Sequence, residues 1–332
     1  MTVFRWWFRA ATAAGGLWAL AAPAHAELQV VVTSKPIHAL VASVMSGAGT
    51  PALLVDGPAS PHTYSMKPSD AQRVHQADVF FRVSERLEPF TAKLVKSLPS
   101  TVRVTTLEDA PGLTLLERRS GGTFQAEGHG GAKGHGGKKG HGPEKGHGHE
   151  HTHEHGAESG RHDPHVWLDP GNAKAMVKEV AKVLAETAPE HSDTFKANAT
   201  ALSDKIDALA LEMERELKPL AGKPFIVFHD AYQYLEKRFG LTAAGSITVS
   251  PDVQPSGKRL TELRRRVTKL GGLCVFAEPQ FAPKMINAVV EGTRAKSGTL
   301  DPEGTALQAG PDLYFTLMRK LAADLKSCLG GA

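Results

Sequence analysis

The chain contains only two cysteines, Cys274 and Cys328, among its 332 residues. They form no C-x-x-C pair, which excludes a thiol redox centre. Aromatic residues make up only 6% of the chain, and the net charge is only +4. Because the basic residues do not gather into a stripe with aromatic side chains, nucleic acid is excluded as a partner. The remaining composition, 41% hydrophobic and 22% charged, is that of a globular protein.

Long apolar stretches are absent after the first 26 residues. Arg5 and Arg9 precede an uncharged stretch that ends in the small-residue site 24–26, a pattern typical of a cleavable export signal. Its apolar part is shorter than the ~20 residues needed to span a membrane, and a lipid anchor would require a cysteine at the cleavage point. We therefore predict a signal peptide over residues 1–26 and a mature periplasmic protein that does not span the membrane.

Apolar β-rich runs alternate with helical patterns along the chain, which is typical of an α/β fold with mostly parallel sheets. The strand-like runs lie at residues 28–32, 52–55, 79–83, 102–105, 225–228 and 274–277. We predict two lobes, each a mostly parallel sheet flanked by helices. The N-terminal lobe covers residues 27–188 and the C-terminal lobe covers residues 220–332.

A single long helix is predicted between the lobes, over residues 189–219. Proline and glycine are absent from residues 190–218, and apolar residues recur at helical spacing from Phe195 to Leu217. Such a rod would limit hinge motion between the lobes. Two shorter helices with a bend near Asn198 are the alternative.

In an exported chain, two cysteines and no others predict one structural disulfide. Cys274 lies in a strand-like run and Cys328 lies four residues from the end of the chain. Their bridge would attach the C-terminal helix to the sheet of the second lobe. Two buried free thiols are the alternative.

Histidine is abundant, and eight of the 16 histidines lie between residues 129 and 155. Residues 121–160 have a single large apolar side chain, Phe124, so burial cannot offset their conformational entropy and we predict a disordered loop. The H-E-x-x-H pattern of zinc proteases occurs at residues 149–153, but that motif requires a helix and we discount it here. We interpret the loop as a collector with weak auxiliary zinc sites, and a solvated linker is the alternative. Its histidines are His129, His135, His141, His147, His149, His151, His153 and His155.

Three other histidines lie in loops edged by proline and aspartate. His62 follows a predicted strand, His165 lies in the segment D-P-H-V-W-L-D-P, and His229 follows the strand 225–228. In open α/β sheets, ligands bind outside the carboxyl ends of the strands, where we expect His62 and His229. Because these two come from opposite lobes, a shared ligand would lie in the cleft. A hydrogen-bonded loop histidine is the alternative for each residue taken alone.

At these motifs the sequence resembles the metal-binding proteins of ABC importers for Zn²⁺ and Mn²⁺ (solute-binding cluster A-I), most closely the periplasmic zinc-uptake members. The resemblance covers nearly the whole mature chain and rests on residues 58–64, 67–70, 165–170, 227–232, 276–281 and 298–304. It implies two α/β lobes joined by one long helix, with the metal site in the cleft between them. It also implies delivery of Zn²⁺ to an inner-membrane ABC permease that is driven by a cytoplasmic ATPase.

The resemblance implies that His62, His165 and His229 are the metal ligands. Some zinc members have a glutamate immediately before the first histidine, where this chain has Pro61. Proline offers no side-chain donor, so the fourth ligand is water, chloride or Asp301, whose counterpart is a ligand in other members. Three imidazoles favour Zn²⁺ over Mn²⁺, which prefers oxygen ligands, although Cu²⁺ and Ni²⁺ would also bind such a site.

Several functions fit these residues. The first expectation is a monomeric solute-binding protein for zinc uptake. A zinc buffer or metallochaperone without a transporter, or a binding protein for Mn²⁺ or another divalent metal, is the alternative. A zinc hydrolase would need a general base beside the ligand histidines and a nucleophile or nucleotide motif, and none is evident. We therefore expect no enzymatic activity.

Overall fold

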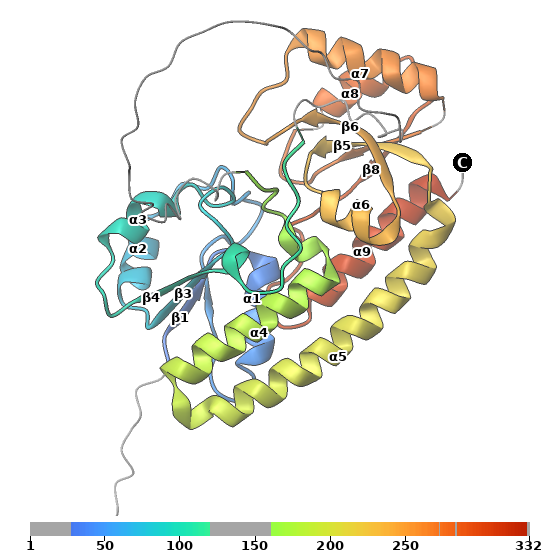
Figure 1. Cartoon of the computed structure of the whole chain (residues 1–332). Helices are drawn as coiled ribbons and strands as arrows, with labels where there is room; N and C mark the ends of the chain where they lie inside the picture. The colour runs from blue at the N-terminus through green and yellow to red at the C-terminus, as the bar shows by residue number, and fades with distance from the viewer. Residues whose placement is uncertain (1–27, 120–160, 272, 283, 331–332) are drawn as a thin grey trace, which may run out of the picture.

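The computed structural model describes residues 28–119, 161–271, 273–282 and 284–330. It contains two α/β lobes beside each other, with the long helix α5 (Ser192–Leu217) running along both of them (Figure 1). The predicted signal peptide and the whole of the predicted histidine-rich loop, residues 121–160, lie outside the described residues.

The N-terminal lobe is built on a four-stranded parallel sheet with the strand order β2-β1-β3-β4. Its strands are β1 (Val30–Val32), β2 (Ala52–Leu53), β3 (Val79–Arg82) and β4 (Arg103–Thr106). The inner strands are apolar runs with nearly every side chain buried, as expected when helices cover both faces of a parallel sheet. The strand order reverses direction between β1 and β3, and the carboxyl ends there are the expected position for a ligand.

The C-terminal lobe repeats this topology, with the strand order β6-β5-β7-β8 and all strands parallel. Its strands are β5 (Pro224–His229), β6 (Thr242–Thr248), β7 (Cys274–Ala277) and β8 (Lys296–Thr299). Here the switch point lies between β5 and β7. His229 is the last residue of β5 and Glu278 directly follows β7, so both side chains lie at the carboxyl edge of this sheet.

Helices flank both sheets, and local sequence determines where several of them begin. The α-helices are α1 (Lys35–Val44), α2 (Pro68–His75), α3 (Thr91–Ser97), α4 (Pro170–Thr187), α5 (Ser192–Leu217), α6 (Gln233–Phe239), α7 (Gly257–Leu270), α8 (Lys284–Val290) and α9 (Leu313–Leu329). Short 3₁₀ turns lie at Leu107–Asp109, Val166–Leu168, Pro189–His191 and Lys218–Leu220. Helix α4 starts where the Asp169 side chain accepts a hydrogen bond from the Gly171 amide, and Pro170 occupies its first turn.

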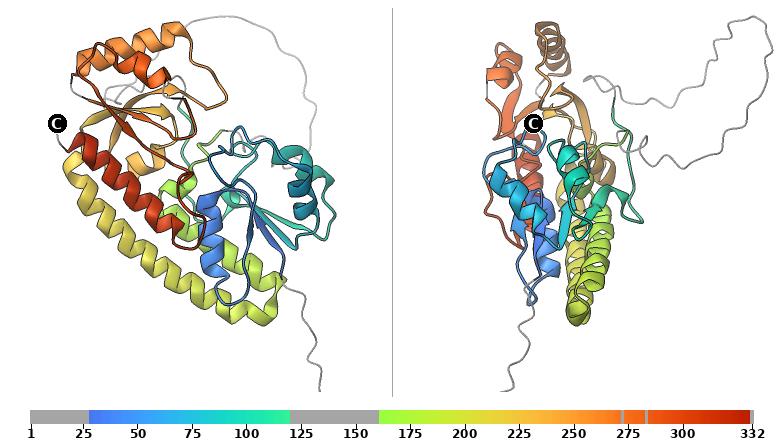
Figure 2. Two further views of the ribbon diagram at one scale, coloured as in Figure 1. Left: turned by 180° about the vertical axis from the view of Figure 1, so that it is seen from behind. Right: turned by 90° about the vertical axis from the view of Figure 1, so that its left-hand side faces the viewer.

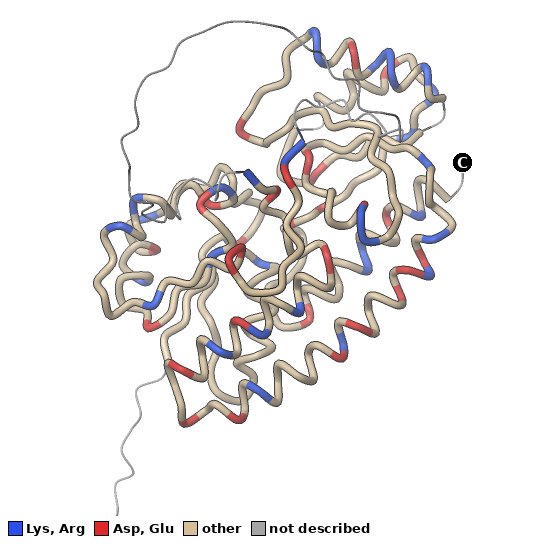
Figure 3. Tube along the Cα trace, viewed as in Figure 1, with Lys and Arg blue, Asp and Glu red and all other residues tan. Residues whose placement is uncertain are grey.

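Helix α5 is continuous over 26 residues, so the predicted long helix is confirmed and the bend near Asn198 is absent. The Asn198 side chain donates to the backbone oxygens of Val44 and Ser46 rather than to its own helix. The backbone hydrogen bonds within α5 are therefore not disturbed at this position. Apolar side chains at helical spacing on one face of α5, from Phe195 to Leu217, are buried, whereas Leu211 is exposed and charged residues recur along the helix (Figure 3).

The C-terminal helix α9 packs beside α5 and also against α1 of the N-terminal lobe. Figure 2 shows this arrangement from behind, with α9 lying alongside α5. The hydrophobic core is therefore continuous from one lobe to the other and includes residues of α1, α4, α5 and α9. The lobes are joined by packed helices as well as by the chain connection.

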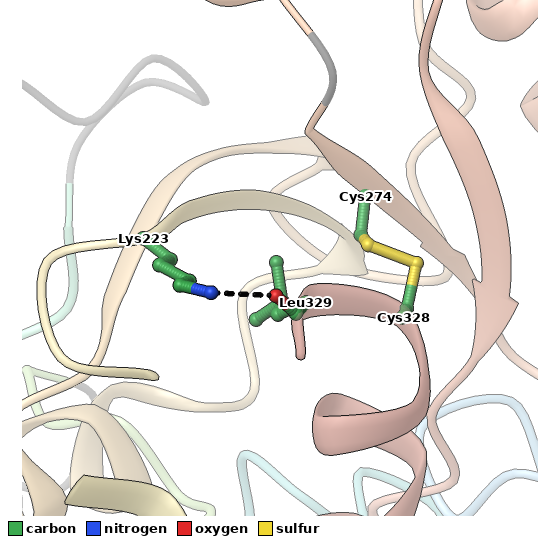
Figure 4. The surroundings of a disulfide bond; sticks show 4 residues. All are labelled: Lys223, Cys274, Cys328 and Leu329. Carbon is green, nitrogen blue, oxygen red and sulfur yellow. Dashed lines mark hydrogen bonds between the residues drawn. A yellow bond between two sulfur atoms is a disulfide. The ribbon is translucent and has the colours of Figure 1, made fainter. Parts of the chain in front are cut away.

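The predicted disulfide is present and joins Cys274 of β7 to Cys328 of α9 (Figure 4). Beside it, the Lys223 ammonium donates to the Leu329 backbone oxygen at 2.9 Å. Both contacts fix the end of α9 to the C-terminal sheet. Within the described part of the chain, no helix is long and apolar enough to cross a membrane.

Candidate metal centre

The structure brings His62, His165 and His229 together between the lobes. His62 lies in the turn that follows β2, His165 directly precedes the 3₁₀ turn before α4, and His229 ends β5. One ring nitrogen from each histidine lies within 4.8 Å of the other two. The Nε2 atom of His165 is 3.2 Å from Nε2 of His62 and 3.2 Å from Nε2 of His229.

These spacings match a tetrahedral zinc site. Zn–N bonds of 2.0–2.1 Å at tetrahedral angles place the nitrogen atoms roughly 3.3 Å apart. The two nitrogen pairs at 3.2 Å therefore have the separation that a shared Zn²⁺ ion requires. Three nitrogen donors leave the fourth position of the tetrahedron to another species.

Two of the histidines are oriented by buried carboxylates. Nδ1 of His165 lies 2.7 Å from Asp163 Oδ1, and Nδ1 of His229 lies 2.6 Å from Glu278 Oε1. When Nδ1 donates its proton to a carboxylate, the Nε2 lone pair is free for a metal, and the ring orientation is fixed. All four side chains are at least 97% buried, so water does not compete for these bonds.

His62 has no such carboxylate. Its ring packs 5.3 Å from the ring of His165 and 5.5 Å from that of His229, between ring centroids. Within the described part of the chain, the only hydrogen-bond partner of the His62 ring is His165. The site therefore has two histidines held by carboxylates and one held mainly by its loop.

The protonation equilibria favour neutral imidazoles at two positions. Burial lowers the pKa of His62 and His165 well below the ordinary value, and the neighbouring histidines lower it further. Burial also opposes protonation of His229, but the Glu278 carboxylate, with Asp230 and Asp163, raises the pKa of His229 above its ordinary value. Proton competition for a metal is thus concentrated at His229.

The structure does not bring Asp301 into this group of ligand atoms. Asp301 follows β8, is buried, and accepts hydrogen bonds from atoms of its own loop. The donors are the Glu303 amide at 3.2 Å, the Thr305 hydroxyl at 3.0 Å and the Ala306 amide at 3.3 Å. Both carboxylate oxygens are used in these bonds, so Asp301 organises the loop after β8.

An arginine close to the site connects the two lobes. The Arg119 guanidinium donates to both carboxylate oxygens of Asp230, the neighbour of His229, and to both oxygens of Glu236 on α6. Asp230 and Glu236 are buried, and Arg119 is 23% exposed. These bonds fix the segment that begins the histidine-rich loop against the strand that carries His229.

Two of these supporting residues lie within motifs of the sequence. Asp163 lies two positions before His165, within the same D-P-H motif, and Glu278 lies in the motif at residues 276–281. Arg119 carries no motif, and its role follows only from its contacts. A short-range spacing could have indicated Asp163, whereas the contact between His229 and Glu278 spans 49 residues and requires the fold.

The site lies in a small cavity of about 20 Å³ between the lobes, and the charged residues in its lining are three arginines and two aspartates. Besides the three histidines it is lined by Arg86, Arg118, Arg119, Asp163, Pro164, Asp230, Gln233, Val249 and Ser250. A space of this size holds about one water-sized species, as a metal site requires.

Comparison with known proteins relates the chain to proteins of zinc uptake. The family model described as zinc-uptake complex component A, periplasmic (ZnuA), matches residues 30–328. The high-affinity zinc uptake system protein ZnuA of Brucella abortus is 50% identical over 304 residues, covering 90% of this chain and 91% of that protein. The protein of the same description from Paracoccus denitrificans is 40% identical over 319 residues, covering 96% and 97%.

Solved structures share the fold. A crystal structure of ZnuA superposes with a TM-score of 0.70 at 20% identity, covering 92% of this chain and all of that one. The Zn(II)-bound ZnuA-like domain of Streptococcus pneumoniae AdcA has a TM-score of 0.65 at 23% identity, covering 92% and 99%. The predicted two-lobe architecture is confirmed. The family-model match over residues 30–328 and the 50% identity to the Brucella protein show that this chain belongs to the family of periplasmic component A proteins of zinc-uptake complexes.

Proposed function

We propose that this protein captures one Zn²⁺ ion between its lobes with His62, His165 and His229 and delivers it to an ABC permease. The observation that carries the proposal is the group of three ring nitrogens within 4.8 Å of one another, with both Nε2–Nε2 distances from His165 at 3.2 Å. Two of the histidines also have Nδ1 held by a buried carboxylate. Family membership and the zinc-uptake description of its relatives support the same cargo.

The donor set favours zinc over manganese, because nitrogen donors suit Zn²⁺ and Mn²⁺ prefers carboxylate and water oxygens. The Asp163 and Glu278 oxygens lie behind the imidazoles, on Nδ1, and are not presented to the ion. Cu²⁺ and Ni²⁺ bind three imidazoles well, so discrimination against them depends on tetrahedral geometry and metal supply.

Transport suits this site better than hydrolysis. A catalytic zinc site needs a general base within reach of the metal-bound water. Asp163 and Glu278 are the buried carboxylates nearest the ligands, and both are occupied by histidine Nδ1 atoms. We therefore retain the proposal that the protein is not an enzyme.

The interface between the lobes favours a small conformational change on delivery. The Trp167 indole donates to the Pro302 backbone oxygen at 3.0 Å, and the Tyr314 hydroxyl donates to the Trp167 backbone oxygen at 2.9 Å. Lys35 of α1 donates to the Thr305 and Leu307 backbone oxygens. Opening the cleft widely would break these buried bonds. We propose that loops at the cleft, including that of His62, move while the helical layer stays in place.

We also retain the proposals that residues 1–26 are a cleaved export signal, that the mature chain acts in the periplasm as a monomer, and that residues 27–188 and 220–332 are its two lobes. The partner would be an inner-membrane permease with its cytoplasmic ATPase. A periplasmic zinc buffer without a transporter has the same site. Zinc uptake by cells lacking this protein distinguishes the two, because a buffer is not required for uptake at scarce zinc.

The histidine-rich loop remains a proposed auxiliary zinc collector. Its described ends lie at the metal cavity: the Arg118 amide donates to the Arg161 backbone oxygen, and Glu117 and His162 form a bridge. The chain thus leaves and re-enters the described structure beside the site. A tether this close raises the local zinc concentration at the cleft.

Zinc titration against a competing chelator tests the main proposal. Alanine substitution of His62, His165 or His229 should each abolish the tight site, while alanine at the exposed His75 on α2 should leave it unchanged. Each variant is first checked for a native thermal transition. If an alanine variant of one of these three histidines folds and binds the first zinc ion as tightly as the unmodified chain, that histidine is not a ligand of the site.

A further inference from the structure

Arg86 lines the metal cavity without a role in the proposed zinc site. It lies in the loop after β3, at the carboxyl edge of the N-terminal sheet, and shares the cavity with the three histidines and Arg118. Its side chain is half-buried. A guanidinium is a fixed positive charge with five N–H donors, so its presence at a cation site requires an explanation.

Arg86 makes no hydrogen bond or ion pair within the described part of the chain. Its neighbour Arg119 differs, because its guanidinium is used by Asp230 and Glu236. Three carboxylates lie near Arg86, and none of them forms an ion pair with it. Asp163 accepts from His165 and Gln233, Asp252 accepts from the Ser250 hydroxyl, and Glu108 is hydrogen-bonded to Ser84. The Arg86 donors are therefore available to a ligand.

The charges around the cavity favour an anion as that ligand. Burial lowers the pKa of Arg86 and the nearby Arg118 guanidinium lowers it further, while the carboxylates of Asp252, Asp163 and Glu108 offset only part of this shift. Zn²⁺ bound to three neutral imidazoles would add two more positive charges to the same space. A negative ion between Zn²⁺ and the guanidinium would turn these repulsions into attractions.

The coordination and the size of the cavity restrict the anion further. Three nitrogen donors leave one tetrahedral position of zinc open, Pro61 provides no donor, and Asp301 is held by its own loop. The cavity of about 20 Å³ has room for about one water-sized species beside a small metal ion held between the three ring nitrogens, which is too little for phosphate or sulfate. A monatomic anion fits.

We propose that Arg86 holds a halide ion as the fourth ligand of the bound metal, so that Zn²⁺ and one halide are captured together. This inference rests on the proposed function, because it requires Zn²⁺ at the three histidines. In the periplasm the halide would be chloride. Arg86 acts as an anion-binding residue at the metal, and its guanidinium selects the halide by its negative charge and small size.

Zinc-edge X-ray absorption tests the inference directly. The full-length chain is loaded with one equivalent of zinc in bromide buffer, because bromine scatters far more strongly than nitrogen or oxygen. The unmodified protein should show three imidazoles and one bromine on zinc. Arg86→Gln should lose the bromine and keep the imidazoles. Arg265→Gln, the same charge change on the exposed face of α7, should keep both.

Zinc affinity provides a second measurement. In the unmodified protein, replacing perchlorate by chloride at constant ionic strength should strengthen zinc binding about tenfold, the effect of one charge-assisted hydrogen bond. Arg86→Gln should abolish this dependence. A bromine-free zinc spectrum with three imidazoles, or halide-independent affinity in the unmodified protein, would overturn the halide proposal while leaving the zinc site intact. Fewer than three imidazoles would instead overturn the proposed function.

Discussion

Replacing Glu278 by Gln should weaken zinc binding about tenfold. The Glu278 carboxylate holds Nδ1 of His229 at 2.6 Å and also accepts from the His229 amide at 3.2 Å, and both side chains are buried. Glutamine has the same shape and can still accept the Nδ1 proton, but it carries no charge. The substitution therefore isolates the electrostatic contribution of the carboxylate to the metal ligand.

The magnitude follows from the kind of bond that is lost. A hydrogen bond to a charged group contributes about 1.5–3 kcal/mol, and a neutral one about 0.5–1.5 kcal/mol. The difference of about 1–1.5 kcal/mol corresponds to roughly a tenfold change in the dissociation constant. Glu278→Ala should weaken binding further, towards about a hundredfold, because it also leaves the buried Nδ1–H without an acceptor.

Chelator competition at pH 8 measures these affinities on the full-length chain with substoichiometric zinc. Glu291→Gln, at an exposed position just after α8, is the matched control and should bind zinc like the unmodified protein. Thermal unfolding of each metal-free variant verifies that the fold is retained. A folded Glu278→Gln protein whose zinc affinity lies within twofold of the unmodified value would refute the argument that this carboxylate supports the ligand.

The remaining predictions concern pH, the interlobe contacts, the disulfide and the loop. Glu278 raises the pKa of His229, so zinc affinity should begin to fall at a pH above about 6.5, the ordinary histidine pKa, as the pH is lowered. Glu278→Gln should shift this decline to lower pH. A flat profile from pH 8 to 5 would contradict histidine ligation. Arg119→Gln leaves two buried carboxylates without their partner and should reduce the free energy of unfolding by about 3 kcal/mol in urea titrations, and an unchanged midpoint would contradict this. Replacing both Cys274 and Cys328 by serine should lower the free energy of unfolding by about 4 kcal/mol, because the disulfide closes a loop of 54 residues in the unfolded chain. Zinc affinity should not change. Deletion of residues 121–160 should preserve one tight zinc site and reduce the total number of zinc ions bound in calorimetry, and equal stoichiometry would refute the collector role.

Sequence patterns predicted the strands that form the centre of each sheet and missed two at the edges. The inner strands β1, β3, β5 and β7 are continuous apolar runs, which the pattern detects. Strand β8 has the sequence K-S-G-T and lies at the edge of its sheet, mostly exposed, so no apolar run indicates it. Strand β6 is built largely from small residues, which lack the usual β-branched signal.

The proximity of the three histidines could be predicted because His62 and His229 were expected at strand ends, which converge in parallel sheets, and because the motifs, including that of His165, resembled a known family. Of the carboxylates behind them, Asp163 lies two positions before His165 and could be derived from local spacing, whereas Glu278 could not. Glu278 meets His229 only because β5 and β7 are neighbours in the sheet, a pairing that joins residues 49 positions apart. Asp301, expected as a possible fourth ligand, is instead hydrogen-bonded within its own loop.

The most direct test of the account is a crystal structure of the full-length protein loaded with one equivalent of zinc, with anomalous data collected on both sides of the zinc edge. We predict a single strong anomalous peak between the lobes, about 2.0–2.1 Å from Nε2 of each of His62, His165 and His229. Nδ1 of His165 and His229 should remain bonded to Asp163 and Glu278. A zinc peak that contacts fewer than three of these histidines, or lies outside the cavity between the lobes, would contradict the account.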